Sequence, residues 1–220
     1  MGIYYFPCEF VYWKKNKKHS EMKDYLMKEI SKYESLHKNN TQGVNNGFTS
    51  YGKSQNFLKD PKLLEHIVMK PFQEMIDEFN ARNNVDQLNI KCCAVQDAWY
   101  TKYDVGGNFP FHTHNEGECC DNDNMIFYRS FSAIYILNDT SKKNVTEFFL
   151  PNMCKTSAFS KSDFRFNTGD QPGIDEGSVI IFPSSLYHQV LPVLEPGRIT
   201  ISYNLICSYS GEPKRYQLVD

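Results

Sequence analysis

The sequence has no uninterrupted apolar run long enough to cross a bilayer. Its first residues also lack the basic segment and long apolar core of a secretory signal. Neither sign of charge dominates: 24 Lys and Arg stand against 26 Asp and Glu, a formal net charge of −2. These absences argue against a membrane partner and give no strong nucleic-acid signal. We expect a cytoplasmic protein, and the sequence leaves its oligomeric state open.

Cysteine spacings typical of zinc or redox sites are also missing. The 7 cysteines include the adjacent pairs Cys92-Cys93 and Cys119-Cys120, but no Cys-x-x-Cys. Adjacent cysteines chelate one metal poorly, because the cysteines of a zinc pair are usually separated by at least two residues. An odd number of cysteines without a secretion signal predicts reduced thiols.

The 220 residues, 40% of them hydrophobic, suffice for one domain with a substantial core. Helical spacing of apolar residues is typical of residues 1–87, and short strand-like segments are typical of residues 88–220. No internal repeat is present. We predict one structural unit, in which an N-terminal helical and loop region packs on a β core.

Two helices are predicted in the first part. Apolar residues recur at helical spacing over residues 21–37, and Ser20 is placed to cap that helix. A second helix is predicted over residues 60–80, kinked or split by Pro71. Residues 38–56 are rich in Asn, Gly, Thr and Ser and predict a loop, which could be a substrate lid or a plain connection.

The second part predicts a series of short strands separated by turns, as in an antiparallel sandwich or barrel. The expected strands span residues 90–103, 109–114, 125–137, 145–150, 178–182, 189–193 and 198–208, with an edge strand within residues 3–13. Residues 115–124 and 151–177 are expected to be irregular. Helices followed by strands predict an α+β protein, mainly β, with N-terminal helices bracing the sheet.

A set of histidines in the strand region indicates a metal site. His112 and His114 are two residues apart, so on a strand both point to one face and suit a chelating pair. His188, on a later predicted strand, could complete a set of three ligands. Three protein ligands leave positions open on a metal, as catalysis requires and a structural site does not.

Several motifs follow one another in a defined order around these histidines. They are Tyr-x-x-Gly from Tyr103, Tyr-Ile-Leu-Asn-Asp at 135–139, Thr-x-Phe at 146–148, Gly-x-x-x-x-Phe-Pro at 177–183, and Arg198 with Thr200 after His188. In this order they resemble the Fe(II)- and 2-oxoglutarate-dependent dioxygenases, and most closely the prolyl-hydroxylase-like branch with its uncharacterised bacterial and phage relatives. The resemblance covers about residues 97 to 207. It implies a double-stranded β-helix, the jelly-roll or cupin-like core, within residues 88–220.

The resemblance also implies an activity. Such an enzyme couples oxidative decarboxylation of 2-oxoglutarate to succinate with hydroxylation of a second substrate, using Fe(II) and dioxygen. The expected metal ligands are His112, His114 and His188. The second substrate is not specified by the sequence and could be a protein side chain such as proline or a small molecule.

The resemblance places the distal carboxylate of 2-oxoglutarate against Arg198. A guanidinium suits this role because it matches a carboxylate with two parallel hydrogen bonds. Thr200 faces the same way as Arg198 on a strand and could donate a further hydrogen bond. Tyr135 and Tyr103 could reach the same carboxylate.

The pattern departs from the family at His114, where the family has aspartate. Two interpretations stay open: an all-histidine metal site, or a third ligand from the loop carboxylates Glu116, Glu118 or Asp121. Strand geometry favours His114, because it points at the metal without rearrangement of a loop. An all-neutral ligand set would leave the iron more positive than two histidines and a carboxylate would, with consequences for metal affinity and redox tuning.

Two other functions remain open for the same residues. One is a non-catalytic or sensor module that keeps the barrel and the metal. The other is a cupin-like metal enzyme that does not use 2-oxoglutarate. We expect Arg198 to argue against the second, because a buried guanidinium needs an anion to offset its desolvation.

Overall fold

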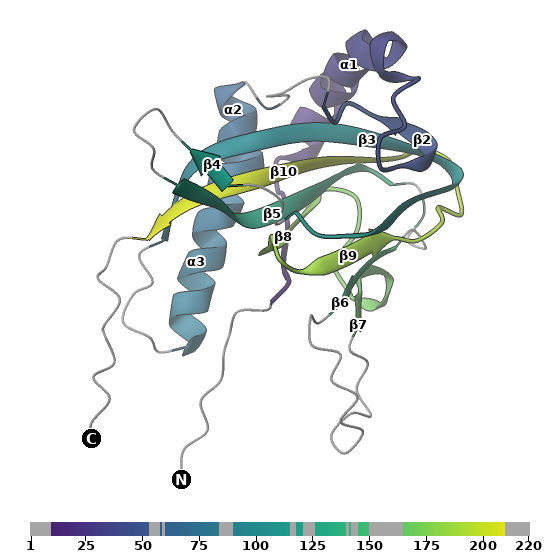
Figure 1. Cartoon of the computed structure of the whole chain (residues 1–220). Helices are drawn as coiled ribbons and strands as arrows, with labels where there is room; N and C mark the ends of the chain where they lie inside the picture. Colours follow the sequence, from purple (N-terminus) through teal and green to yellow (C-terminus); the bar gives the residue numbers. More distant parts are fainter. Residues whose placement is uncertain are drawn as a thin grey trace, which may run out of the picture.

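The structure is a computed structural model of the 220-residue chain. It describes residues 10–52, 58, 60–83, 90–114, 118–120, 126–139, 141, 145–149 and 165–209. Within these residues, a curled antiparallel sheet has helices on one side (Figure 1). No helix in this part of the chain is long and apolar enough to cross a membrane.

The helices precede most of the strands in the chain. The helical elements are α1 (His19–His37), α2 (Pro61–Leu63), the π-helix η1 (Leu64–Met69), α3 (Lys70–Asn83) and the short 3-10 helix η2 (Thr168–Asp170). The strands are β1 (Tyr12–Lys15), β2 (Asn45–Thr49), β3 (Ile90–His112), β4 (Glu118–Cys120), β5 (Ile126–Asn138), β6 (Thr146–Phe149), β7 (Arg165–Asn167), β8 (Ser178–Pro183), β9 (Tyr187–Val190) and β10 (Arg198–Tyr209). This order confirms a mainly β chain with N-terminal helices.

The strands are hydrogen-bonded in the order β1-β8-β5-β10-β3-β9-β6-β7, with β2 on β3 and β4 on β5. Strand β3 belongs to two parts of this sheet. Its first part pairs with β10, and its last part pairs with β9, where His112 lies opposite His188. The sheet therefore folds over along β3, and β9, β6 and β7 form a second layer facing β5 and β10 (Figure 1).

The bend in β3 explains one difference from the sequence analysis. We predicted two strands there, over residues 90–103 and 109–114. The structure has one long strand, in which Gly106 adopts a φ of +78° and a Cβ on Gly107 would collide with the carbonyl oxygen of Asn46. The two glycines thus bend the strand and let β2 approach closely, rather than ending the strand.

Strand β2 is a second difference, because it lies inside the segment predicted as a loop. Its sequence, Asn-Asn-Gly-Phe-Thr, has little β propensity. It is a strand because its backbone pairs with β3, where Phe48 lies opposite Lys102 and Thr49 opposite Thr101. Pairing with a partner distant in sequence cannot be inferred from local composition.

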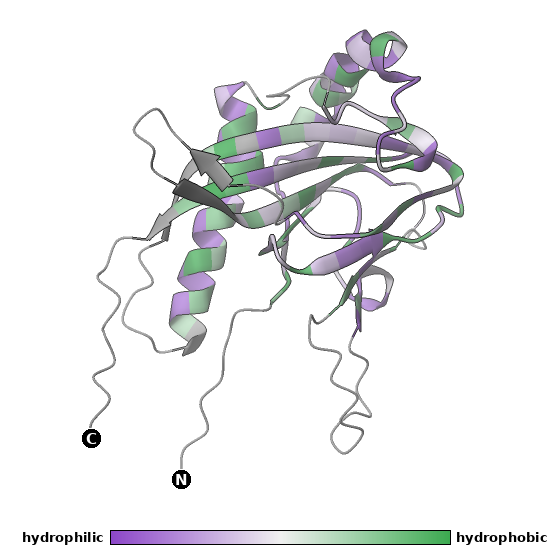
Figure 2. Ribbon diagram, viewed as in Figure 1, coloured by the Kyte–Doolittle hydropathy of each residue, from purple (hydrophilic) through white to green (hydrophobic). Residues whose placement is uncertain are grey.

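The main core lies between the helices and one face of the sheet. Helix side chains such as Leu26, Ile30, Ile67 and Phe72 meet strand side chains such as Ala133, Tyr135, Ile201 and Tyr203, all buried. Figure 2 shows hydrophobic and hydrophilic residues alternating around α3, as expected for a helix with one buried face. Burial of each large apolar side chain stabilises the fold by roughly 1.5–3 kcal/mol.

Helix α1 begins earlier than predicted. Its first residue is His19, and Lys18 occupies the N-cap position without a side-chain hydrogen bond. Ser20 therefore lies inside the first turn and is not the cap that we expected. The side chain of Asn16, by contrast, accepts a hydrogen bond from the backbone N–H of Lys18 and so fixes the entry into the helix.

Pro71 changes the geometry of its helix, as predicted, but it does not interrupt the helix. The helical run from Pro61 to Asn83 is continuous, and its π-helical segment ends at Met69, two residues before the proline. At the end of that segment the N–H of Lys70 bonds to the carbonyl of Glu65, five residues earlier. The wider turn accommodates the proline ring, which would otherwise clash with the preceding turn.

Pro71 has no N–H, so carbonyl groups one turn earlier need other donors. The side chain of Asn16 donates to the carbonyl of His66 at 3.3 Å. The buried hydroxyl of Tyr203 on β10 donates to the carbonyl of Ile67 at 2.7 Å. The first bond attaches the helix to the turn between β1 and α1, and the second attaches it to β10, the strand that carries Arg198.

Candidate metal centre

Three histidines converge inside the barrel. His112 and His188 lie opposite each other across the β3–β9 pair, and His114 follows two residues later. The backbone N–H of His114 donates to the carbonyl of Ser184, which fixes this residue beyond the end of β3. The ligand atoms of the three rings lie within 4.8 Å of one another, and the Nε2 atoms of His112 and His114 are 3.1 Å apart.

The far side of each ring is held by an oxygen atom. The Nδ1 atoms face the carbonyl oxygen of Pro110 for His112 (2.7 Å), the side-chain oxygen of Asn204 for His114 (2.7 Å) and the carbonyl oxygen of Leu186 for His188 (3.0 Å). These oxygens only accept hydrogen bonds, so the Nδ1 atoms carry the protons. The lone pairs of the Nε2 atoms are then free to bind one metal ion.

Burial favours the neutral form of His112 and His188. Desolvation lowers the pKa of His188 well below its usual value, and the nearby His112 and His114 lower it further. Desolvation also lowers the pKa of His112. A neutral imidazole is the form that binds metals. Three converging neutral imidazoles fit a divalent transition-metal ion such as iron.

Asn204 contacts this site and was not assigned to it by the sequence analysis. It is 1% exposed, and its side-chain oxygen accepts hydrogen bonds from His114 and from the hydroxyl of Ser132 at 2.8 Å. The alternation of polar and apolar residues along the sequence could have identified it. On β10, polar side chains at even-numbered positions 198 to 204 alternate with apolar ones, so Asn204 shares the inward face with Arg198.

A small cavity adjoins the three histidines. Its lining includes Tyr103 of β3, Thr146 of β6 and Thr200 of β10, besides the histidines themselves. Tyr103 lies opposite Arg198 across the β3–β10 pair. The structure therefore brings together the histidines, Tyr103 and Thr200, as the sequence analysis expected, and adds Thr146.

Arg198 lies beside this cavity and is 1% exposed. Its Nη1 atom donates to the carboxylate of Asp139 at 2.9 Å, and its Nη2 atom donates to the hydroxyl of Thr146 at 3.1 Å. Its Nε atom is buried without a hydrogen-bond partner among the described residues. An acceptor from a ligand could fill that position, so the surroundings of Arg198 fit an anionic cosubstrate.

The pairing with Asp139 corrects one argument made from the sequence. We expected a buried Arg198 to require a bound anion and so to argue against an enzyme that does not use 2-oxoglutarate. Asp139 is itself an anion with a side chain 7% exposed, and it offsets the charge of the guanidinium within the protein. The burial of Arg198 alone therefore does not discriminate between the two functions.

Tyr103 and Thr200 contact each other next to Arg198. Burial raises the pKa of the Tyr103 phenol, while the charge of Arg198 and hydrogen bonds with Thr200 and Thr101 partly oppose this effect. Tyr103 therefore stays protonated at neutral pH and can donate a hydrogen bond to an anion.

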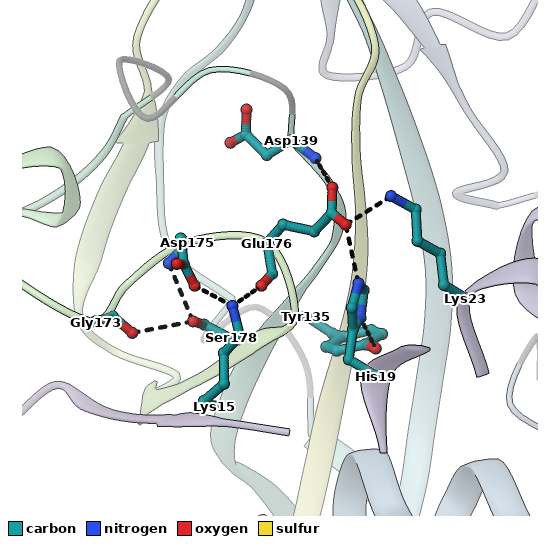
Figure 3. Close-up of polar contacts among 9 residues, drawn as sticks. All are labelled: Lys15, His19, Lys23, Tyr135, Asp139, Gly173, Asp175, Glu176 and Ser178. Carbon is teal, nitrogen blue, oxygen red and sulfur yellow. Dashed lines mark hydrogen bonds and ion pairs between the residues drawn. The ribbon is translucent and has the colours of Figure 1, made fainter. Parts of the chain in front are cut away.

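The structure does not place Tyr135 in the cavity. On β5, Ile134 lines the cavity, so Tyr135 points to the opposite face and packs in the core under the helices. Its hydroxyl lies 2.6 Å from Nδ1 of His19 on α1 (Figure 3). The role predicted for Tyr135 in cosubstrate binding is corrected accordingly, because adjacent residues of a strand face opposite sides.

The alternative metal ligands cannot be placed. Glu116, Asp121 and the side chain of Glu118 lie outside the described residues. Within the described part of the chain, His112, His114 and His188 are the group found in an arrangement that could hold a metal.

Comparisons with known proteins support the fold. No family model matches the sequence, and no curated protein matches it. Among solved structures, the chain is similar to a Pseudomonas putida prolyl-4-hydroxylase (TM-score 0.53, 12% identity, 90% of this chain and 92% of that one). It is similar to a Trichoplax adhaerens prolyl hydroxylase in complex with a hypoxia-inducible factor peptide (TM-score 0.51, 16% identity, 89% of this chain and 83% of that one). It is also similar to SnoK, a non-haem α-ketoglutarate-dependent carbocyclase of nogalamycin biosynthesis (TM-score 0.58, 9% identity, 92% of this chain and 82% of that one).

These structural neighbours are prolyl hydroxylases and other 2-oxoglutarate–Fe(II) oxygenases. The chain has their fold, the double-stranded β-helix, and the predicted fold class is confirmed. At identities of 9% to 16%, the likeness is one of fold. The activity of this chain must be argued from its own residues.

Proposed function

We propose that this protein is an Fe(II)- and 2-oxoglutarate-dependent oxygenase that hydroxylates a second substrate. The observation that carries the proposal is the convergence of three Nε2 atoms from His112, His114 and His188, each on a ring whose Nδ1 faces an acceptor. Such a set holds a metal through one face and leaves other coordination positions for ligands.

The residues around the cavity support 2-oxoglutarate as cosubstrate. Arg198, Thr200 and Tyr103 form a cluster of hydrogen-bond donors beside the three histidines. A 2-oxo acid that chelates the metal would direct its distal end towards this cluster. The likeness in fold to an α-ketoglutarate-dependent enzyme agrees with this assignment.

The bound metal and cosubstrate would supply the activation of dioxygen. The residues of the chain orient the metal ligands, bind the distal carboxylate and enclose the centre. Phe148 and Phe182 pack against His188 with ring centroids 5.7 and 4.8 Å away, and both are buried. This apolar wall limits access of water to the centre.

We propose a protein side chain, such as proline, as the second substrate, with a small molecule as the alternative. Two of the structural neighbours are prolyl hydroxylases, one of them bound to a peptide, and a third is a carbocyclase from a biosynthetic pathway. Uncoupled turnover provides the first test. The iron-loaded protein should release succinate from 2-oxoglutarate in air, and His188→Ala should not. Absence of succinate from the iron-loaded wild type would overturn the proposal.

A metal enzyme or sensor of this fold without 2-oxoglutarate is the second candidate. The Asp139–Arg198 pair favours it, because the expected cosubstrate anchor already has an anion. Binding separates the two candidates. If the Mn(II)-loaded protein binds no 2-oxo acid in a calorimetric titration, the second candidate holds.

A further inference from the structure

Asp139 and Arg198 form a buried, neutral pair at the position expected to bind the cosubstrate. Their side chains are 7% and 1% exposed, and the distance from Nη1 to Oδ2 is 2.9 Å. Arg198 keeps an unpartnered Nε among the described residues. It therefore has donor capacity left for a ligand, but its charge is already offset.

Asp139 is held in place from two sides. Its carboxylate accepts a hydrogen bond from the backbone N–H of Ser141 at 3.2 Å. Its own backbone N–H donates to Oε2 of Glu176 at 3.0 Å (Figure 3). These bonds fix both the backbone and the carboxylate at the turn after β5. An arriving ligand thus meets an ion pair rather than a guanidinium that is free to rotate.

Glu176 is in turn anchored to helix α1. Lys23 donates to it at 2.6 Å, and His19 lies 3.1 Å from the same oxygen atom (Figure 3). Burial alone would raise the pKa of Glu176, but hydrogen bonds from Lys23, the N–H of Asp139 and His19 lower it to about 2. The anchor of Asp139 therefore stays charged at neutral pH.

The charges around the cavity are unevenly distributed as a result. The three proposed ligands are neutral histidines, so a divalent metal keeps its full charge at one end. At the other end Arg198 and Asp139 cancel. Attraction for an anion is concentrated at the metal end, where the chelating 2-oxo acid group would bind.

We propose that Asp139 sets the cosubstrate preference of this site. By neutralising Arg198, it makes the pocket discriminate only weakly between a 2-oxo acid with a distal carboxylate and one with an uncharged tail. This inference rests on the proposed function, since it assumes that a 2-oxo acid binds at the three histidines.

Calorimetry on the Mn(II)-loaded protein tests the inference without turnover. The ligands are 2-oxoglutarate and 2-oxopentanoate, which has the same chain length but no distal charge. In the wild type, the two dissociation constants should differ by less than about ten-fold. In Asp139→Asn, which keeps the shape and an acceptor oxygen, the preference for 2-oxoglutarate should rise by roughly ten-fold or more, because Arg198 regains its net charge.

Two further variants complete the experiment. Asp175→Asn removes the carboxylate of a more exposed ion pair with Lys15 and should leave the preference unchanged. The double variant Asp139→Asn/Arg198→Gln removes both buried charges, so no lone charge threatens folding, and its two dissociation constants should be within about two-fold of each other. It decides the question if the single variant does not fold.

The outcomes are distinguishable. An unchanged preference in folded Asp139→Asn overturns the role of Asp139 while leaving the proposed function intact. A preference for 2-oxoglutarate above about ten-fold, in the wild type or in the double variant, also overturns the role of Asp139 and leaves the proposed function intact. If neither 2-oxo acid binds the wild-type Mn(II) protein, the proposed function fails and this inference fails with it.

Discussion

His112 and His188 face each other across the β3–β9 pair, with ring centroids 4.1 Å apart. Their backbones are fixed by strand pairing, and each Nδ1 is held by a carbonyl oxygen only two residues away in sequence. The orientation of the pair is therefore set by the two strands that carry it. Only the third histidine depends on a distant side chain, that of Asn204.

Asn204 should position His114 for metal binding. Asn204→Ala removes the acceptor for Nδ1 of His114, and loss of such a partner typically lowers metal affinity by about 10–100-fold. Asn204→Asp keeps an acceptor oxygen and should recover most of the affinity. Competition titrations with a chromophoric chelator measure both variants. Equal affinity in Asn204→Ala and the wild type would show that this hydrogen bond does not matter.

The metal-free protein should lose stability as the pH falls. The pKa of His188 is lowered in the folded state, so below the ordinary value of about 6.5 the unfolded chain binds a proton that the folded chain does not. Stability is therefore present above that pH and is lost as the pH falls towards the folded pKa. Urea unfolding between about pH 7.5 and 5.5 measures the slope. His188→Gln should flatten it, whereas His66→Gln, on η1, should not.

Arg198 should bind the distal carboxylate of 2-oxoglutarate. Arg198→Ala should weaken the binding of 2-oxoglutarate strongly and leave metal stoichiometry unchanged, because the carboxylate of Asp139 would then face the distal carboxylate without its partner. It should also destabilise the protein by about 3–5 kcal/mol, since Asp139 would stay buried without its partner. Arg165→Ala is the control, because Arg165 is largely exposed and its pairing with Glu147 is long, at 3.8 Å. Unchanged 2-oxoglutarate affinity in Arg198→Ala would exclude the assigned role.

Tyr203 should contribute to stability through the helix that contains Pro71. Tyr203→Phe removes the donor to the buried carbonyl of Ile67 and should cost about 1–3 kcal/mol in the free energy of unfolding. Tyr187→Phe, at a position 39% exposed, should cost much less. Denaturant titrations compare the two variants. Equal stabilities would mean that the Ile67 carbonyl has another donor.

The fold could be predicted because the relevant patterns are local. Alternation along β10 and helical spacing in α1 and α3 need only neighbouring residues. The long β3 and the short β2 were not predicted, because both depend on pairing between segments far apart in sequence. Gly106 and Gly107 lie between the two predicted strands, and only the position of β2 shows that they bend one continuous strand.

The site could be predicted in part for the same reason. His112, His114, His188 and Thr200 followed from strand phase and motif order, and the structure brings them together with Tyr103. Tyr135 was assigned to the wrong face, although strand phase relative to its neighbours was available as a check. Asp139 lay inside a quoted motif, but its contact with Arg198 spans 59 residues and required the fold.

The central claim is that three histidines hold the metal. It depends most on His114, where the pattern of the dioxygenases has aspartate. Iron titration under anaerobic conditions of the wild type, His114→Ala and His114→Asp tests it most directly. We predict one Fe(II) per chain in the wild type, clearly weaker binding in His114→Ala, and retained binding in His114→Asp, since a carboxylate is also an iron ligand. Unchanged affinity in His114→Ala, with loss of binding on replacement of Glu116, Glu118 or Asp121, would contradict the account.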